Sequence, residues 1–430
     1  MSSGISTTKD QAGHGYPFVS FGTVFNNYFL PEQLPDLMDT SEKEQDIYSI
    51  KEGDILITRT SETIDELAMS CVATKNYPKA TYSGFTKRLR PKTTGIAYHK
   101  YLAFYLRGYL FRKAVTNNAF MTLRASFNED IFSFLNLYLP EYQEQVKIGD
   151  MHYNMEQKIR LNQKICSELE TMAKTLYDYW FVQFDFPNEE GKPYKSSGGA
   201  MVWNEELKRE IPQGWSNMSI GDYAPCKSGY AFKSKDFGGK GLPVIKIGNI
   251  QENYTLDMTD SQCIGLFNKT LFLAKRYDLV IAMTGATIGK FAISQSNYWV
   301  NQRVGRFDLG DRPLLRLGFL FNSLKQEYFR EQVSQIACGC AQPNISAEQI
   351  DSISILKPND VILNQFNKLC EPLLELQSEN YLQIEELTKQ RNELLPLLMS
   401  GQVSVNSDLS VYKKRRGKVP SSILNDVSDI

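Results

Sequence analysis

A long internal repeat limits what this chain can fold into. The apolar and small residues of 140–180 recur over 358–398, and every matched pair lies 218 positions apart without a gap. A looser echo relates residues 51–64 to residues 275–288 at a shift of 224. A repeat of this length is too long for a solenoid unit, so it predicts two equivalent domains related by a pseudo-two-fold axis.

The strict part of the repeat has the period of a long amphipathic helix. Its seam positions step by three and four residues, with one slip at Asn162 and one at Asn380. Such steps predict coiled-coil packing, and each slip is a stutter that locally unwinds the supercoil. The two asparagines either form a buried polar pair that fixes the register or face solvent. The predicted seam contains Met151, Met155, Asn162, Leu169 and Leu176 in the first helix and Leu369, Leu373, Asn380, Leu387 and Leu394 in the second.

The modules upstream of each helix mix strand-like alternation with longer periods, which is typical of an α+β fold. We therefore predict two α/β domains in pseudo-two-fold tandem repeat, separated by two long antiparallel coiled-coil helices. The predicted boundaries are residues 1–140 for the first module, 141–182 for the first helix, 183–358 for a linker and the second module, 359–401 for the second helix, and 402–430 for a basic tail.

Composition favours a protein of a reducing cytoplasm. Seven cysteines without paired CxxC spacing argue against a disulfide framework and a structural zinc site. No stretch approaches the ~18 apolar residues of a membrane span. The net charge of −1 does not by itself indicate nucleic-acid binding, although a local basic cleft can coexist with acidic helices.

Catalytic motifs are mostly absent. The glycine-rich run 285–291 has Phe291 where a P-loop needs Ser or Thr, so it reads as a turn between strands. Asp185, Glu206 and Lys208 have loose nuclease spacing but fall in a linker, and His152 reads as a surface or seam-edge residue. We predict no catalytic residue, no metal and no cofactor. A binding or organising protein is favoured over an enzyme.

Several phrases, taken together and in order, resemble one family. They include Trp180 within the aromatic run 176–187, Gly191 and Pro193, the run 211–215, and the segments 244–249, 341–346 and 394–401. This combination is similar to the specificity subunits of type I restriction-modification systems.

The resemblance implies that both modules are target-recognition domains, each reading half of a bipartite sequence in double-stranded DNA. It also implies that the paired helices set the spacing of the half-sites and dock two methyltransferase subunits, with restriction and translocase subunits joining the complex. A competing hypothesis is a coiled-coil scaffold whose modules bind proteins.

In the second module, two groups are candidates for DNA contact. The loop 227–235 interleaves cations and aromatics around a glycine, and we select Lys227, Ser228, Tyr230, Lys233 and Lys235. Thr284, Gly285, Gln302, Arg303 and Arg306 form a second cluster if their strands are neighbours, because Gln and Arg can bond to base edges. The alternatives are a solvated loop and an ordinary sheet edge.

In the first module, Arg59, Thr60 and Ser61 align with Met283, Thr284 and Gly285. The run 87–92 supplies Lys87, Arg88, Arg90 and Lys92, which we predict to contact phosphates or bases. A solvated charge run is the alternative. The tail cluster 413–418 is a weaker candidate, since terminal basic runs are often only solubilising.

Overall fold

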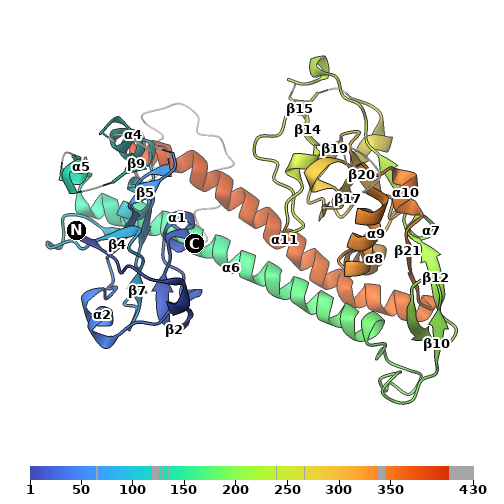
Figure 1. Ribbon diagram of the computed structural model, residues 1–430. Coiled ribbons are helices and arrows are strands. Elements are labelled where there is room, and N and C mark those ends of the chain that lie inside the picture. Colours follow the sequence, from blue (N-terminus) through green and yellow to red (C-terminus); the bar gives the residue numbers. More distant parts are fainter. Residues whose placement is uncertain are drawn as a thin grey trace. The chain divides into compact units, whose positions relative to one another are not determined.

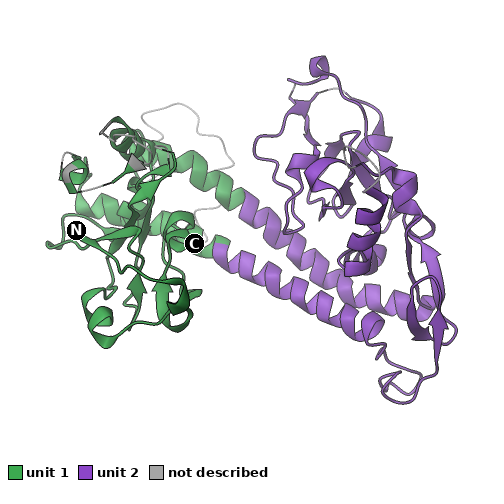
Figure 2. Ribbon diagram, in the orientation of Figure 1, with its two compact units in different colours: residues 1–159, 386–430 green, residues 160–385 purple. Residues whose placement is uncertain are grey.

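The computed structural model describes residues 1–63, 66–118, 125–127, 129–133, 135–238, 240–265, 267–337 and 344–405 of the chain. The chain forms two compact units, coloured separately in Figure 2. Unit 1 contains residues 1–159 and 386–430, and unit 2 contains residues 160–385. Each unit therefore combines a β-rich module with part of both long helices. The basic run 413–418 lies outside the described residues.

Unit 1 is built on a four-stranded antiparallel sheet with the order β1-β8-β4-β6. The strands are β1 (Ser2–Ser3), β8 (Thr86–Leu89), β4 (Ile55–Thr58) and β6 (Ser70–Val72). A second sheet contains β3 (Asp36–Met38), β2 (Ala12–Val19) and β7 (Thr81–Tyr82), and β5 (Thr60–Ser61) pairs with β9 (Ala125–Ser126). β4 lies between two neighbours and its four residues are buried, as its apolar sequence requires.

Short helices lie between these strands in the sequence, and their first residues explain where two of them begin. Ser20 accepts a hydrogen bond from the backbone N–H of Thr23, and Ser41 forms a capping box with Glu44. The helices are α1 (Phe21–Asn26), α2 (Glu42–Ile47), α3 (His99–Tyr105), α4 (Tyr109–Asn118) and α5 (Glu129–Ser133), with a 3-10 turn at Lys9–Gln11.

Unit 2 has a sheet of the same kind, with the order β13-β20-β17-β18. Its strands are β13 (Cys226–Ser228), β20 (Val304–Phe307), β17 (Leu279–Ala282) and β18 (Phe291–Ile293). A second sheet contains β15 (Cys263–Ile264), β14 (Leu242–Ile245), β19 (Tyr298–Val300) and β16 (Leu273–Ala274). Two further pairs are β10 (Met201–Asn204) with β11 (Arg209–Pro212) and β12 (Ser216–Ser219) with β21 (Ser354–Lys357).

The helices of unit 2 pack against an aromatic core. Phe181, in the π-helical turn Asp178–Val182, lies 4.9 Å from Phe366 and 5.1 Å from Phe319 between ring centroids. The helices are α7 (Ile220–Tyr223), α8 (Leu314–Leu324), α9 (Glu327–Ala337) and α10 (Ala347–Asp351), with 3-10 turns at Ser234–Asp236, Ile247–Asn249, Thr270–Phe272 and Gly285–Thr287. The 3-10 turn at Gly285 joins β17 to the chain leading into β18, in agreement with the predicted turn.

The two main sheets repeat each other in register. In unit 1, Leu56 of β4 pairs with Arg88 of β8, and in unit 2, Val280 of β17 pairs with Arg306 of β20. Both strands are antiparallel to both of their neighbours. The predicted α+β tandem architecture is therefore confirmed at the level of individual strand pairs.

Two long helices, α6 (Tyr142–Tyr177) and α11 (Asp360–Met399), contribute to both units. Within each unit they lie side by side and antiparallel (Figure 1). In unit 1, Arg391 donates to Glu156 at 2.8 Å, and in unit 2, Asn162 donates to Gln383 at 3.1 Å. α11 is followed by Gly401 with φ of +69°, the left-handed stop that a helix end favours.

The buried stripe of α6 follows the predicted seam from Asn162 onward. Asn162 and Leu169 are buried, and Leu176 is half-buried. Nearer the start of the helix the stripe lies one position later than predicted, because His152 and Glu156 face the interior and leave Met151 and Met155 half-buried.

On α11, Leu373, Leu387 and Leu394 are half-buried and Asn380 is buried. The prediction for Leu369 is wrong, since its side chain is 50% exposed. Cys370 packs so closely on Gly318 of α8 that an added Cβ on Gly318 would lie 2.6 Å from the Cβ of Cys370. Because successive side chains of a helix point in different directions, Leu369 faces away from this contact.

The two seam asparagines are buried, yet they do not bond to each other. Asn162 donates to Gln383, while Asn380 donates at 2.7 Å to the carbonyl of Leu376 on its own helix. Their burial, 5% and 6% exposed, rules out the solvent-facing alternative. A polar link between the helices therefore exists at this level, but its partner is Gln383.

Candidate nucleic-acid interface

One end of the main sheet of unit 2 gathers several of the predicted contact residues. β17 ends at Ala282 and β20 begins at Val304 directly opposite it. Beyond this pair, the N–H of Met283 donates to the carbonyl of Arg303 at 3.0 Å, and the N–H of Gln302 donates to the carbonyl of Tyr230 at 3.0 Å. The two predicted groups of unit 2 therefore meet at this sheet end.

The chain enters β20 through a turn that presents two side chains. The N–H of Val304 donates to the carbonyl of Asn301 at 2.9 Å, and the N–H of Arg303 donates to Oδ1 of Asn301 at 3.3 Å. These bonds fix the turn from both main chain and side chain. Gln302 and Arg303, between them, are exposed. Thr284 and Gly285, which follow Met283, are half-buried.

The loop after β13 is held close to the sheet. A Cβ on Gly229 would lie 2.2 Å from the carbonyl oxygen of Val300, so only glycine fits there. Tyr230 packs among tilted aromatic rings, with the centroid of Phe272 at 5.2 Å, and Lys269 lies over its face at 4.8 Å. Ser228, Lys233 and Lys235 are exposed and remain candidates for phosphate contact.

Two predicted cations of unit 2 are held by carboxylates. Arg306 pairs with Asp278 at 3.0 Å, with side chains 13% and 7% exposed. Lys227 pairs with Asp308, and this hydrogen bond lowers the pKa of the Asp308 carboxyl. Burial raises the pKa of Asp278 despite the arginine beside it. Arg306 therefore stabilises the sheet, and we no longer propose it as a DNA contact.

Unit 1 has the same sheet end, with different side chains. The N–H of Arg59 donates to the carbonyl of Phe85 at 2.8 Å, and Thr60 pairs with Ser126 as Thr284 pairs with Asn344. Arg59 is exposed, Thr60 is half-buried, and Ser61 is buried. The predicted alignment of 59–61 with 283–285 is thus reproduced by equivalent backbone pairing.

The basic run of unit 1 does not join this cluster. β8 starts at the sheet end that carries Arg59 and leaves it at Leu89, so Arg90 and Lys92 lie toward the other end. Arg90 pairs with Asp54 at 2.6 Å, and Arg88 donates to the carbonyl of Ser49. These two arginines hold the turn before β4. We no longer propose them as DNA contacts.

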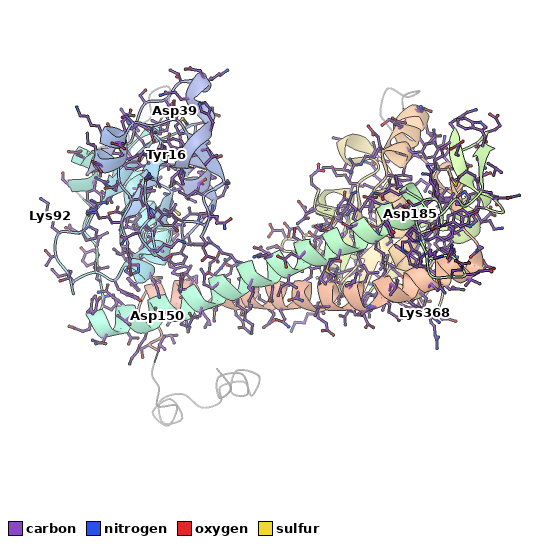
Figure 3. All side chains as sticks on the ribbon, turned by 90° about the horizontal axis from the view of Figure 1, so that it is seen from below. Tyr16, Asp39, Lys92, Asp150, Asp185 and Lys368 are labelled. Carbon is purple, nitrogen blue, oxygen red and sulfur yellow. The ribbon has the colours of Figure 1, made fainter. Side chains whose placement is uncertain are left out.

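The two lysines of the run differ from the arginines and from each other. Lys87 lies 3.9 Å from Glu129 and its side chain is 12% exposed. Lys92 is exposed, and Figure 3 shows it at the rim of unit 1, apart from Tyr16 and Asp39. Lys92 remains available to a phosphate, but away from the Arg59 end of the sheet.

The family to which the chain belongs follows from a comparison of its sequence with known protein families. The model described as type I restriction modification DNA specificity domain matches twice, over residues 4–171 and 212–386. The chain belongs to this family. The two matches cover both modules and much of both helices, so the tandem repeat is a pair of specificity domains, and the membership supports a role in DNA recognition.

Named relatives and one solved structure agree with this membership. The MjaIX type I restriction enzyme specificity subunit of Methanocaldococcus jannaschii is 23% identical and covers 93% of this chain and 86% of its own. The HindI specificity subunit of Haemophilus influenzae is also 23% identical, over 91% of this chain and 95% of its own. The crystal structure of an S subunit from M. genitalium shares the fold, with a TM-score of 0.56 at 13% identity and 92% of each chain covered.

Three residues of this specificity chain were missing from the predicted contacts. Ser83, Gly84 and Phe85 form the turn into β8, in the place that Asn301, Gln302 and Arg303 occupy in unit 2. The signal was present in the sequence, because the shift of 218 that aligns the helices also aligns these turns. The predicted match at a shift of 224 covered only the strand before them.

The described residues contain no group of three or more His, Cys, Asp or Glu side chains arranged to hold a metal ion. Asp185 accepts hydrogen bonds from Ser196, whereas Glu206 accepts one from Ser354, so the loosely spaced nuclease residues are engaged separately. No helix in the described part of the chain is long and apolar enough to cross a membrane.

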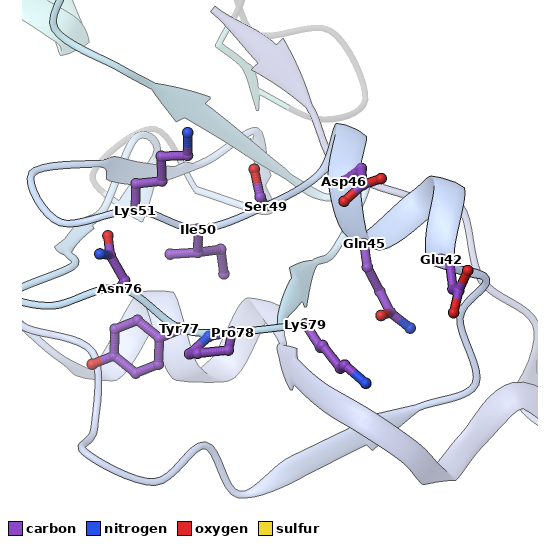
Figure 4. A pocket seen from close by; sticks show the side chains of 10 residues that line it. All are labelled: Glu42, Gln45, Asp46, Ser49, Ile50, Lys51, Asn76, Tyr77, Pro78 and Lys79. Atoms are coloured by element: carbon purple, nitrogen blue, oxygen red, sulfur yellow. The ribbon is translucent and has the colours of Figure 1, made fainter.

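A hollow of about 570 Å³ lies in unit 1 between α2 and the turn at residues 76–79 (Figure 4). Its lining mixes acidic and basic side chains such as Glu42, Asp46 and Lys51. The hydroxyl of Tyr77 donates to the carbonyls of Leu30 and Pro31, which ties it to the fold. The hollow therefore has no arrangement of nucleophile and base, and it does not compete with the sheet ends as the functional site.

Proposed function

We propose that this chain is the non-catalytic sequence-reading subunit of a type I restriction-modification complex. Unit 1 reads one half of a bipartite target in double-stranded DNA, and unit 2 reads the other half. The observation that carries the proposal is the repeated sheet end, where the same backbone pairing exposes Arg59 in unit 1 and Gln302 with Arg303 in unit 2. A constant frame with different exposed side chains is what reading two different sequences requires.

Within this proposal, α6 and α11 set the distance between the half-sites and dock two methyltransferase subunits. Exposed apolar side chains on both helices support the docking role, since contiguous apolar patches on a protein surface mark interaction sites. In unit 2, Leu161 and Met172 of α6 and Leu369 and Leu376 of α11 are 57%, 56%, 50% and 46% exposed. Restriction and translocase subunits would join through the same complex. The chain itself would need no cofactor, and it would act in the cytoplasm, where the DNA is.

Methylome sequencing of the host with and without this gene tests the proposal. The expected result is one bipartite motif, methylated in both halves, that disappears when the gene is deleted. Gel-shift assays of the chain with its methyltransferase subunits should show sequence-dependent binding that weakens with salt. Methylation that does not change on deletion, together with binding to a protein partner but not to DNA, would instead identify a scaffold.

A second test addresses the spacing role. Inserting one heptad into each helix should lengthen the tolerated spacer and leave both half-site sequences unchanged. A selection of binding sites from random DNA reports both quantities at once. Altered half-sites with an unchanged spacer would contradict the role of the helices as a spacer.

A further inference from the structure

The turns that precede β8 and β20 are built in the same way, bond by bond. In unit 1, the N–H of Thr86 donates to the carbonyl of Ser83 at 2.9 Å and the N–H of Phe85 donates to Oγ of Ser83 at 3.2 Å. In unit 2, Asn301 accepts the two equivalent bonds from Val304 and Arg303. Each turn is therefore fixed by a main-chain bond and a side-chain bond, and each presents the two residues at its centre.

The surroundings of the turns are equally alike. A Cβ on Gly4 would lie 2.2 Å from the carbonyl oxygen of Tyr82, and a Cβ on Gly229 would lie 2.2 Å from that of Val300. The carbonyl of the residue after each glycine, Ile5 or Tyr230, accepts a hydrogen bond from the first central residue of the turn. In both units, the backbone of the glycine and of the residue after it packs against the turn. The central side chains of the two turns therefore occupy equivalent positions.

The central residues themselves differ in chemistry. They are Gly84 and Phe85 in unit 1 and Gln302 and Arg303 in unit 2. The residue on the adjacent strand differs in the opposite sense. Arg59 is exposed beside Phe85, whereas Met283, 5% exposed, lies beside Arg303. Each sheet end thus has one arginine and one apolar residue, with the two exchanged between neighbouring strands.

Phe85 is 61% exposed although it stands on a fixed turn. Folding gains little from a phenyl ring left in water, so the ring is suited to a partner that arrives from outside. Arg59 beside it is suited to DNA. In the major groove, the apolar group on a base edge is the C5-methyl of thymine, and phenylalanine is one of the side chains that contact it.

We propose that Phe85 is a specificity-determining residue that reads the C5-methyl group of a thymine in the half-site of unit 1. The inference rests on the proposed function, and it adds which residue reads and which chemical group is read. Gln302 and Arg303, at the same place in unit 2, read polar purine edges instead. The two half-sites accordingly differ in the kind of contact made at equivalent positions.

Replacement of thymine by uracil tests this contact, because uracil lacks only the methyl group. The full chain, in complex with its methyltransferase subunits, is titrated with its target and with targets carrying uracil at single positions. Wild type should lose about fourfold in affinity at one thymine of the half-site of unit 1, the value of one buried methyl group. Phe85→Ala should bind the thymine target more weakly and lose nothing further with uracil. Phe85→Leu should retain part of the discrimination.

Tyr138→Ala is the matched control, because Tyr138 is an aromatic of unit 1 that is 81% exposed and whose N–H donates to the hydroxyl of Tyr105 on α3. It should leave the uracil effect unchanged. If Phe85→Ala weakens binding equally to all targets and still discriminates thymine from uracil, Phe85 acts as a non-specific wedge and the inference is overturned. If wild type binds without sequence preference, the proposed function itself fails, which is a different result.

Discussion

The sheet ends of unit 1 and unit 2 share a backbone frame, meaning the same strand pairing, turn and buried aspartate. They differ in the side chains that this frame exposes. Asp54 and Asp278 each accept a hydrogen bond from the N–H three residues earlier, at 2.7 and 2.9 Å, and so close the turn before the central strand. Arg90 pairs with Asp54, whereas Arg306 pairs with Asp278 from a different strand position. The buried aspartate and the backbone pairing are thus retained, while the arginines and the tip residues vary. Reading two different sequences is compatible with one fold because variation is confined to side chains that the frame does not need.

The largest expected effect concerns the two buried aspartates. Asp278→Ala leaves Arg306 unpaired with its side chain only 13% exposed, and should destabilise unit 2 by about 3–5 kcal/mol. Asp54→Ala should cost unit 1 less, about 1–3 kcal/mol, because the side chain of Arg90 is 37% exposed and can turn to water. Urea unfolding, monitored by hydrogen exchange of the amides in each unit, measures the free energy of unfolding of both units. Equal losses of unfolding free energy would contradict the expected difference between the two ion pairs.

A second difference between the units is their response to acid. The shift of 218 aligns His152 with Cys370, and both are fully buried. Burial, with a smaller contribution from Arg391, lowers the pKa of His152 from 6.5 to about 4, whereas burial raises the pKa of Cys370 to about 12. Between pH 6.5 and about 4 the unfolded chain takes up a proton that folded unit 1 does not, so unit 1 should lose up to about 3 kcal/mol.

Unit 2 has a neutral thiol at the same position throughout this range, so its stability should not change through that group. His152→Cys, which copies unit 2 into unit 1, should reduce the acid sensitivity and leave the contribution of His99, whose pKa burial also lowers. Unfolding free energies at pH 7 and pH 4.5 for both chains measure the effect. An unchanged pH slope in the variant would exclude His152 as its origin.

The glycines beneath the two turns should be equally intolerant of a side chain. Gly4→Ala and Gly229→Ala each force a Cβ against a backbone carbonyl and should cost about 1–3 kcal/mol. Gly248→Ala is a suitable control, since no atom lies within 4 Å of its added Cβ. Thermal unfolding of the three variants is compared. A loss of stability for Gly229→Ala without one for Gly4→Ala would show that the two turns are not supported in the same way.

The smallest effects concern DNA affinity in unit 1. Arg59→Ala removes an exposed cation at the reading end of the sheet and should weaken binding about tenfold. Lys92→Ala, toward the other end, should change affinity by less than about twofold. Fluorescence anisotropy with the methyltransferase complex at one fixed salt concentration compares them. A larger loss for Lys92 would move the interface to the basic run.

Sequence reasoning could predict the features that depend on periodicity and local chemistry. The repeat predicts the tandem fold, and the three-four spacing predicts α6 and α11. The alignment of Arg59 with Met283 predicts equivalent strands, because a short, mainly apolar run, buried in the structure, precedes each residue. Each of these depends on neighbours in the sequence.

Features that depend on pairing between distant segments could not be predicted in the same way. Charge alone does not distinguish Arg88, which donates to Ser49, from Arg59, which is exposed, because the difference is set by the register of β8 on β4. The exposure of Leu369 likewise depends on the packing of Cys370 against Gly318. The sequence leaves His152 as a surface or seam-edge residue, and the surface alternative is wrong because the buried stripe of α6 lies one position later than predicted there.

The most direct test of the shared frame is to transfer the turn of one unit into the other. Gln302→Gly combined with Arg303→Phe gives unit 2 the turn centre of unit 1, and binding sites are selected from random DNA with the methyltransferase complex. The expected result is a second half-site changed at one or two positions, with the first half-site and the spacer unchanged. A variant that selects the wild-type motif, or one changed in both half-sites, would contradict the account.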